Sequence, residues 1–263
     1  MTRLLKIGKN LLKTNGLRWT FIYIIYWFIR YFIKIDLTIL YRLLMHLEKK
    51  YDLPGFNSPL TAVDIWDLLP WEKEHGEEWT ISEEWKKSLI DEILHPHISP
   101  GSAVLEIGPG AGRWTEILQA TARKLAIVDV SKKAIDICRS RFSSADNISY
   151  FLISDINLDF IPDETIDAIW SFDVFVHINP ADTENYLSEF KRILLPGGSA
   201  VIHHPGEGGL YGGCRSRMTA GLFRDLLEKY ELTLIRQFDS WGNKNQFNFS
   251  RHKDCISVFQ RAQ

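Results

Sequence analysis

The chain has 263 residues, of which 45% are hydrophobic, 13% aromatic and 24% charged, and its formal net charge is −2. This composition excludes an intrinsically disordered chain, because ample apolar surface is available for a core. It also argues against nucleic acid as a partner, which requires a basic surface. The charge is unevenly distributed: residues 1–34 contain seven Lys or Arg and no acid, and the rest carries a net −9. A basic arm therefore precedes an acidic body.

The N-terminal residues resemble a signal peptide, with basic residues before an apolar run. The run starts late, near residue 19, and no small-residue cleavage site follows, so we expect the segment to be retained. The irregular spacing of Cys138, Cys214 and Cys255 predicts neither a disulfide framework nor a zinc site. A reduced, cytoplasmic location is the simplest interpretation.

Residues 1–50 are predicted to form a basic, aromatic, amphipathic helical arm. A membrane span is disfavoured, because Arg30 and Lys34 interrupt the apolar run Trp19–Ile29. Residues 3–13 place apolar and basic side chains on opposite helical faces, and Trp and Tyr follow. This pattern is typical of helices at a lipid surface, which predicts peripheral contact with the inner face of the membrane. Packing on its own domain, or on a second subunit in a homodimer, is the alternative.

Residues 51–79 are predicted to form an acidic, Trp-rich linker. Its Trp71 and Trp79 either form a lid that contacts substrate or anchor a solvated segment. A regular domain is expected over residues 80–263. Thr80 and Glu83 predict a capping box at the start of its first helix.

Short apolar segments then alternate with amphipathic helical segments, which predicts an α/β fold with a mostly parallel sheet covered on both faces. The last two strands lack a helix-length connection, so an antiparallel finish is expected. The predicted strands are Ala103–Ile107, Leu125–Asp129, Ile148–Ile153, Ile166–Ser171, Ser199–His203, Leu232–Phe238 and Cys255–Gln260. The predicted helices among them are Gly112–Ala120, Lys132–Phe142, Pro180–Leu194 and Thr219–Tyr230.

A glycine-rich turn follows the first predicted strand and precedes a helix, an arrangement that lets a ligand approach the backbone closely. The spacing is G-x-G-x-G, because Arg113 stands where the dinucleotide-binding pattern needs its last glycine. Glu106 at the strand end would repel a pyrophosphate and attract a ligand with an ammonium group. The turn contains Gly108, Pro109, Gly110 and Gly112.

Acidic residues end the next three strands. Asp129, 23 residues after Glu106, is suited to accept hydrogen bonds from two ribose hydroxyls, and Asp155 from an adenine amino group. Asp173 and His177 follow the fourth strand. Each residue alone could be a surface charge or a turn former. Their order at the carboxyl ends of parallel strands instead predicts one binding crevice.

The motifs VLEIGPGAG, IVDVS, ISDIN, SFDVFVHI and ILLPGGSAVIHH resemble those of class I S-adenosylmethionine-dependent methyltransferases. Residues 211–242 resemble, more loosely, the C-terminal part of enzymes that methylate small molecules, including sugars. The resemblance covers residues 80–263 and implies a Rossmann-like seven-stranded sheet with S-adenosylmethionine as cofactor. It places Gly108–Gly112 around the methionine moiety and Asp173 near the sulfonium. It further implies a cofactor site that includes Asp129, Val130, Asp155, Ile156 and Asn157.

Methylation of a hydroxyl requires a base, and His177, His203 and His204 are the candidates because the histidine pKa lies near neutral pH. Each could instead be structural. A metal bound by Asp173 and a histidine is an alternative, but no ligand cluster calls for one, so no metal is expected.

Arg215 and Arg217 follow a glycine-rich loop that could close over an acceptor. They either bind a phosphate or carboxylate or cap the next helix. The expected function is O-methylation of a small-molecule, sugar or glycan- or lipid-linked acceptor. The alternatives are N- or C-methylation of a lipid or quinone-like acceptor, or a non-catalytic cofactor-binding module docked to a membrane or partner.

Overall fold

The computed structural model describes residues 2–34, 38–73, 75–208, 215–250 and 252–263. Residues 209–214, which include Cys214 and most of the glycine-rich loop expected to close over an acceptor, lie outside the described residues.

The arm consists of α1 (Thr2–Phe28), the π-helical turn η1 (Ile29–Ile33) and α2 (Thr38–Tyr51). α1 bends at Gly16, whose φ of +75° is readily adopted only by glycine. Beyond the bend, Trp19 and Tyr26 pack with Leu44 and Leu47 of α2 in a small core of their own. In the described part of the chain, no helix is both long and apolar enough to cross a membrane.

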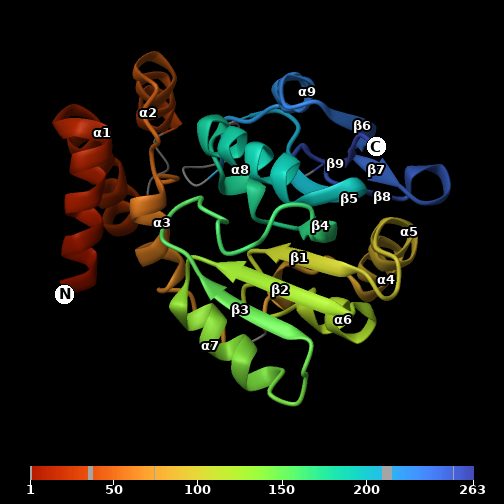
Figure 1. Cartoon of the computed structure of the whole chain (residues 1–263). Coiled ribbons are helices and arrows are strands. Elements are labelled where there is room, and N and C mark those ends of the chain that lie inside the picture. The colour runs from red at the N-terminus through yellow and green to blue at the C-terminus, as the bar shows by residue number, and fades with distance from the viewer. Residues whose placement is uncertain (1, 35–37, 74, 209–214, 251) are drawn as a thin grey trace.

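The segment after the arm contains a helix, α3 (Pro59–Trp66), and a 3-10 turn, η2 (Glu77–Trp79). α3 packs against α1: Lys6 Nζ lies 3.0 Å from Asp64 Oδ1, and Asn10 Nδ2 donates to the Leu60 carbonyl at 3.0 Å. α3 therefore connects the arm to the body (Figure 1).

A helical stretch precedes the sheet and runs through α4 (Glu83–Leu89), η3 (Ile90–Leu94) and α5 (His95–His97). The capping box predicted at Thr80 is wrong. Ser82 is the N-cap, and its side chain accepts from the Trp85 amide, whereas the Thr80 hydroxyl donates to Glu77.

The body is built on a seven-stranded sheet in the order β3-β2-β1-β4-β5-β9-β6, in which only β9 runs antiparallel to its neighbours. The predicted fold class and antiparallel finish are thus confirmed. A short hairpin, β7–β8, was not predicted. The strands are β1 (Ala103–Ile107), β2 (Lys124–Asp129), β3 (Ile148–Leu152), β4 (Ile166–Ser171), β5 (Leu194–Pro205), β6 (Leu232–Phe238), β7 (Ser240–Trp241), β8 (Phe247–Asn248) and β9 (Asp254–Arg261).

Helices cover both faces of the sheet. One core joins side chains of α4, α6 and α7 to one face, and a second core joins α8 and α9 to the other. The arrowheads of β1, β2 and β3 point toward α3 and the arm (Figure 1), so the carboxyl ends of the parallel strands open on that side. The remaining helices are α6 (Thr115–Thr121), α7 (Lys132–Arg141), η4 (Phe175–His177), α8 (Pro180–Ile193), α9 (Ala220–Lys229) and η5 (Asn243–Asn245).

Candidate cofactor and acceptor site

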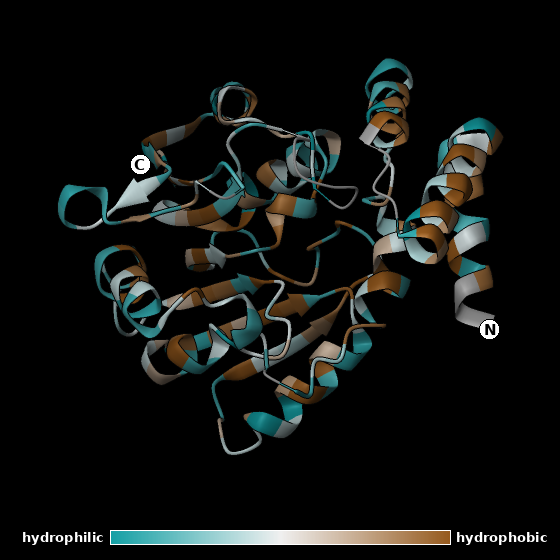
Figure 2. Cartoon of the chain, turned by 180° about the vertical axis from the view of Figure 1, so that it is seen from behind, coloured by the Kyte–Doolittle hydropathy of each residue, from teal (hydrophilic) through white to brown (hydrophobic). Residues whose placement is uncertain are grey.

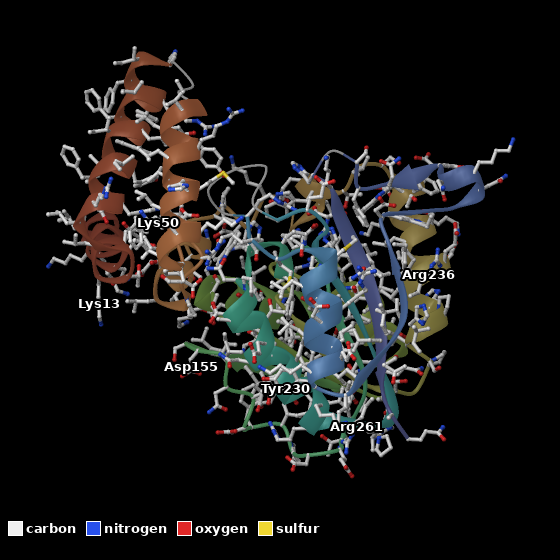
Figure 3. All side chains as sticks on the ribbon, turned by 90° about the horizontal axis from the view of Figure 1, so that it is seen from above. Lys13, Lys50, Asp155, Tyr230, Arg236 and Arg261 are labelled. Atoms are coloured by element: carbon white, nitrogen blue, oxygen red, sulfur yellow. The ribbon has the colours of Figure 1, made fainter. Side chains whose placement is uncertain are left out.

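A cavity of about 820 Å³ lies at the carboxyl ends of the parallel strands. This volume is toward the upper end of the range typical of small-molecule sites, roughly 300–1,000 Å³. α3, η2 and the segment between them contribute one wall, and the glycine turn, β2 and the loop after β4 contribute another. In Figure 3, Asp155 lies on the side of the body that faces the arm, whereas Arg236 and Arg261 lie on the far side.

The glycine turn is packed tightly from both sides. A Cβ on Gly108 (φ +70°) would lie 2.3 Å from Val174, and one on Gly110 (φ +55°) would lie 2.9 Å from Trp71. Only glycine avoids both the contact and the unfavourable φ at these positions. The turn, together with Pro109, lines the cavity and brings its backbone to the ligand space.

Asp129 ends β2, lines the cavity and is buried. Its Oδ1 accepts from the Ser131 amide at 2.8 Å and its Oδ2 from the Gly110 amide at 3.2 Å. Burial raises the pKa of Asp129 to about 6, although these amide bonds favour the carboxylate. Each carboxylate oxygen keeps a second lone pair, so Asp129 can still accept from a ligand hydroxyl.

Val130, Asp155 and Ile156 line the same end of the cavity. Two residues that the sequence analysis did not identify line the cavity with them from α8. The half-buried Asp182 has its pKa raised to about 6 by burial, and Tyr186 is buried. They project from the first turns of a helix, where sequence pattern alone does not reveal a ligand contact.

A chain of ionisable groups lies along the cavity wall. Arg113 Nη2 lies 2.5 Å from Asp173 Oδ2, and His203 Nδ1 lies 3.1 Å from Asp173 Oδ1. His203 Nε2 lies 3.6 Å from Asp254 Oδ2, and Asp254 pairs with Arg215. Burial acts to raise the pKa of Asp173, but the contact with His203 and the charge of Arg113 outweigh it and hold that pKa well below its usual range. Asp173 is therefore a carboxylate at neutral pH.

The three candidate histidines differ in placement. His177 ends η4, is half-buried, lines the cavity and packs against Trp66 with ring centroids 4.8 Å apart. His203 also lines the cavity, but it is only 2% exposed and lies between Asp173 and Asp254. His204 does not line the cavity: its ring stacks on Phe223, its Nε2 lies 2.7 Å from Ser257 Oγ, and burial lowers its pKa to about 3. Of the three, His177 is best placed to reach an acceptor.

Trp71 and Trp79 both line the cavity, and their rings meet edge to face at 5.5 Å. Trp71 is buried and donates from Nε1 to the Trp66 carbonyl, whereas Trp79 is 43% exposed. Arg215 also lines the cavity, but Arg217 does not. Arg217 donates instead to the Glu48 carbonyl and to Asp52 Oδ1, both at 2.9 Å, and so holds the arm.

Three further residues lie elsewhere than expected. Glu106 is buried behind the glycine turn, where its Oε2 accepts from the Thr115 hydroxyl at 2.6 Å and burial raises its pKa to about 8. Gly112 packs against Phe142, because a Cβ on Gly112 would lie 2.6 Å from the Phe142 ring. The Asn157 side chain donates to Asp159 rather than lining the cavity. Among the described residues, no group of three or more His, Cys, Asp or Glu could hold a metal ion.

Comparison with known proteins identifies the domain in which this cavity lies. Residues 104–198, from β1 into β5, match the sequence profile of the family described as "Methyltransferase domain". The chain contains a class I S-adenosylmethionine-dependent methyltransferase domain. This confirms the family and the cofactor that the motifs predicted. The residues fit that cofactor, because an accepting carboxylate, a glycine turn that lines the cavity and apolar walls meet in one place.

The relatives are distant. The demethylmenaquinone methyltransferase of Tropheryma whipplei is 31% identical over 105 residues, which cover 40% of this chain and 42% of that protein. Nodulation protein S of Rhizobium tropici is 32% identical over 104 residues, covering 39% and 43%. The chain thus spans about two fifths of the length of these curated relatives.

Solved structures share the fold of the methyltransferase domain. The PH0226 protein of Pyrococcus horikoshii superposes with a TM-score of 0.57 at 16% identity, covering 75% of this chain and 98% of that one. The N-methyltransferase NodS of Bradyrhizobium japonicum gives 0.53 at 19% identity, covering 69% and 99%. At such identities the likeness concerns the fold alone.

Proposed function

We propose that the protein transfers a methyl group from S-adenosylmethionine to an acceptor hydroxyl, with His177 as the general base. The observation that carries the proposal is that His177 and the ligand-accepting Asp129 line the same cavity of a methyltransferase domain. When bound, S-adenosylmethionine supplies a methyl group on a positively charged sulfur. The protein then has to align an acceptor with that methyl group and remove its proton.

In this proposal, different residues contact different parts of the cofactor. Asp129 accepts from the ribose hydroxyls, with Val130 beside it, and Asp155 and Ile156 lie at the adenine end. The turn from Gly108 to Gly110 presents its backbone to the methionine moiety. Asp173 stays ionised between Arg113 and His203, so it contributes negative charge near the sulfonium end and does not act as a base.

The acceptor we propose is a sugar, a small molecule or a glycan- or lipid-linked molecule. Trp66, Trp71 and Trp79 line the cavity together, and aromatic faces suit both sugar rings and apolar chains. Arg215 lines the same cavity, where it pairs with Asp254, and it is suited to contact a polar substituent. We also propose that the arm keeps the enzyme at the cytoplasmic face of a membrane, where lipid-linked acceptors are found.

A second candidate is N- or C-methylation of a lipid or quinone-like acceptor. It is favoured by the names of two similar proteins, a demethylmenaquinone methyltransferase and an N-methyltransferase. A histidine base is needed less for an amine acceptor, so the two candidates differ in their dependence on His177.

The experiment has two parts. Calorimetry with S-adenosylhomocysteine should give binding that Asp129→Ala severely weakens, and unchanged affinity would refute the assigned pocket. Purified protein is then incubated with methyl-labelled S-adenosylmethionine and fractionated cell extract, and the methylated atom of the labelled product is identified by NMR. An O-methyl product supports the first candidate, and an N- or C-methyl product supports the second. Binding without labelled product would support a non-catalytic module.

A further inference from the structure

The outer face of α1 and η1 carries a continuous apolar stripe. Its side chains recur at helical spacing and are each more than half exposed. The opposite face is also apolar, since Trp19 and Tyr26 are buried against α2 there. A helix that is apolar on both sides needs an apolar environment on each side, and the described residues of the chain provide one on the α2 side alone. The stripe consists of Leu17, Phe21, Ile24, Phe28, Tyr31 and Phe32.

Positively charged residues flank the stripe along the chain. Lys9, Lys13, Arg18 and Lys34 are exposed, and within the described part of the chain none of them forms an ion pair. Residues 1–34 contain no acid at all. Trp27 is 47% exposed and stacks on Tyr31 at 5.2 Å, an arrangement of amphipathic rings suited to the boundary between lipid and water.

The arm is coupled to the cavity through α3. Asp64 of α3 is bound by Lys6 and Asn10 of α1, while Trp66 at the end of the same helix lines the cavity. The arm also stands on the side to which the carboxyl ends of the strands point (Figure 1). Figure 2 shows hydrophobic residues recurring along both arm helices.

We infer that the apolar stripe inserts into the headgroup layer of a membrane containing anionic lipids and holds the cavity next to acceptors in that layer. Burial of the stripe supplies a hydrophobic contribution, and the surrounding cations add attraction to anionic headgroups. A second copy of the chain is a poorer occupant, because two-fold pairing through this face would oppose two sets of the same cations. Only the identity of the acceptor rests on the proposed function, because binding to a membrane can be measured without methyl transfer.

The test is co-sedimentation of the full chain with vesicles of phosphatidylcholine, alone or mixed with phosphatidylglycerol. We expect tighter binding to the mixed vesicles. Combining Phe28→Ser with Phe32→Ser should lower the partition coefficient at least about tenfold, because two aromatic side chains no longer enter the membrane. Combining Lys13→Gln with Arg18→Gln should lower binding to the mixed vesicles alone, by roughly fivefold for each cation removed.

The matched control combines Leu152→Ser with Ile235→Ser, which removes two side chains about half exposed on the body and should leave vesicle binding unchanged. Calorimetry with S-adenosylhomocysteine should give the same affinity for every variant, which separates failure of the arm from failure of the cofactor site. Wild-type protein that binds neither vesicle, or an aromatic variant that binds like wild type, would overturn the inference. The inference would also be overturned if light scattering detected a dimer of the wild-type protein and the aromatic variant were monomeric.

Discussion

Asp129 is placed to make cofactor binding depend on pH. Its pKa of about 6 means that the carboxylate is increasingly protonated below pH 6, and a protonated oxygen accepts hydrogen bonds less well. We expect affinity for S-adenosylhomocysteine to be constant above pH 7 and to fall by up to about tenfold at pH 5. Calorimetry across this range measures the effect. Asp129→Asn should bind weakly at every pH, and a wild-type affinity that stays flat to pH 5 would exclude Asp129 as the titrating acceptor.

His177 should govern the rate rather than cofactor affinity. Replacing it with Gln removes the base but retains a polar side chain beside Trp66, so kcat for an O-methylated acceptor should fall by roughly 10²–10⁴-fold. Affinity for S-adenosylhomocysteine should stay within about twofold, because the proposed cofactor contacts are made by other residues. His97→Gln, outside the cavity, is the control. A His177→Gln enzyme with full kcat would remove His177 from the mechanism.

Residue type and position along a strand were enough to predict Asp129, Asp155, Asp173 and His177 as cavity residues. Residue type and strand position do not predict where the Glu106 side chain lies. A residue near the carboxyl end of a strand can point to either face of the sheet, and Glu106 points to Thr115 on α6. In the sequence, Arg113 stands out only as a departure from the dinucleotide-binding pattern. Its partner Asp173 lies 60 residues away, and no local pattern records such a pair.

The glycine turn joins the cofactor site to the wall that contains Trp71. In Gly110→Ala the new Cβ would lie 2.9 Å from Trp71. The alanine backbone would also have to adopt an unfavourable φ of +55°. Gly101→Ala is a matched control, because its φ is +81° but nothing lies within 4 Å of the new Cβ. Both variants should lose about 1 kcal/mol of stability from backbone strain. Only Gly110→Ala should also lose affinity for S-adenosylhomocysteine, by about tenfold or more, and equal affinities would show that the Trp71 contact is unimportant.

Glu48 of α2 connects the two arm helices, since its Oε1 accepts from Trp19 Nε1 at 2.9 Å. Burial raises its pKa from 4.5 to about 7. Its carboxyl therefore stabilises the fold fully below pH 4.5, and that contribution is lost as the pH rises through 7. Glu48→Gln keeps an acceptor for Trp19 without the ionisation. We expect it to raise the free energy of unfolding at pH 8 by about 1–3 kcal/mol and to change it little at pH 4.5. Denaturant titrations at both pH values test this, and an equal effect at both would contradict it.

At the level of elements, the alternation of strands and helices predicted the sheet because buried parallel strands read as continuous apolar runs. The same logic does not extend to residues 51–79. α3 is only eight residues long, α1 packs on it, and Asp64 is bound from that side. Its contribution to the cavity wall therefore depends on a contact across more than 50 residues of sequence.

The whole molecule contains a small arm core and two larger cores around the sheet. α3 is one connection between arm and body, because α1 packs on it and its Trp66 packs against His177, and Arg217 is another, because it binds Glu48 and Asp52. Asp64 is 4% exposed and accepts from both Lys6 and Asn10. Asp64→Ala leaves the buried Asn10 amide without this partner, which costs about 1–3 kcal/mol at the contact between arm and body. We therefore expect the arm to open locally while the sheet stays folded.

Hydrogen exchange resolved along the chain measures this uncoupling. In Asp64→Ala, exchange should accelerate by roughly tenfold or more in α1 and α3, and not in β1, β4 or β5. The control is Asp163→Ala, which removes an exposed carboxylate paired with Arg192 on the body and should leave the arm unchanged. If amide exchange accelerates equally in α1 and in the sheet, the arm and the body unfold as one unit, which would contradict local opening of the arm.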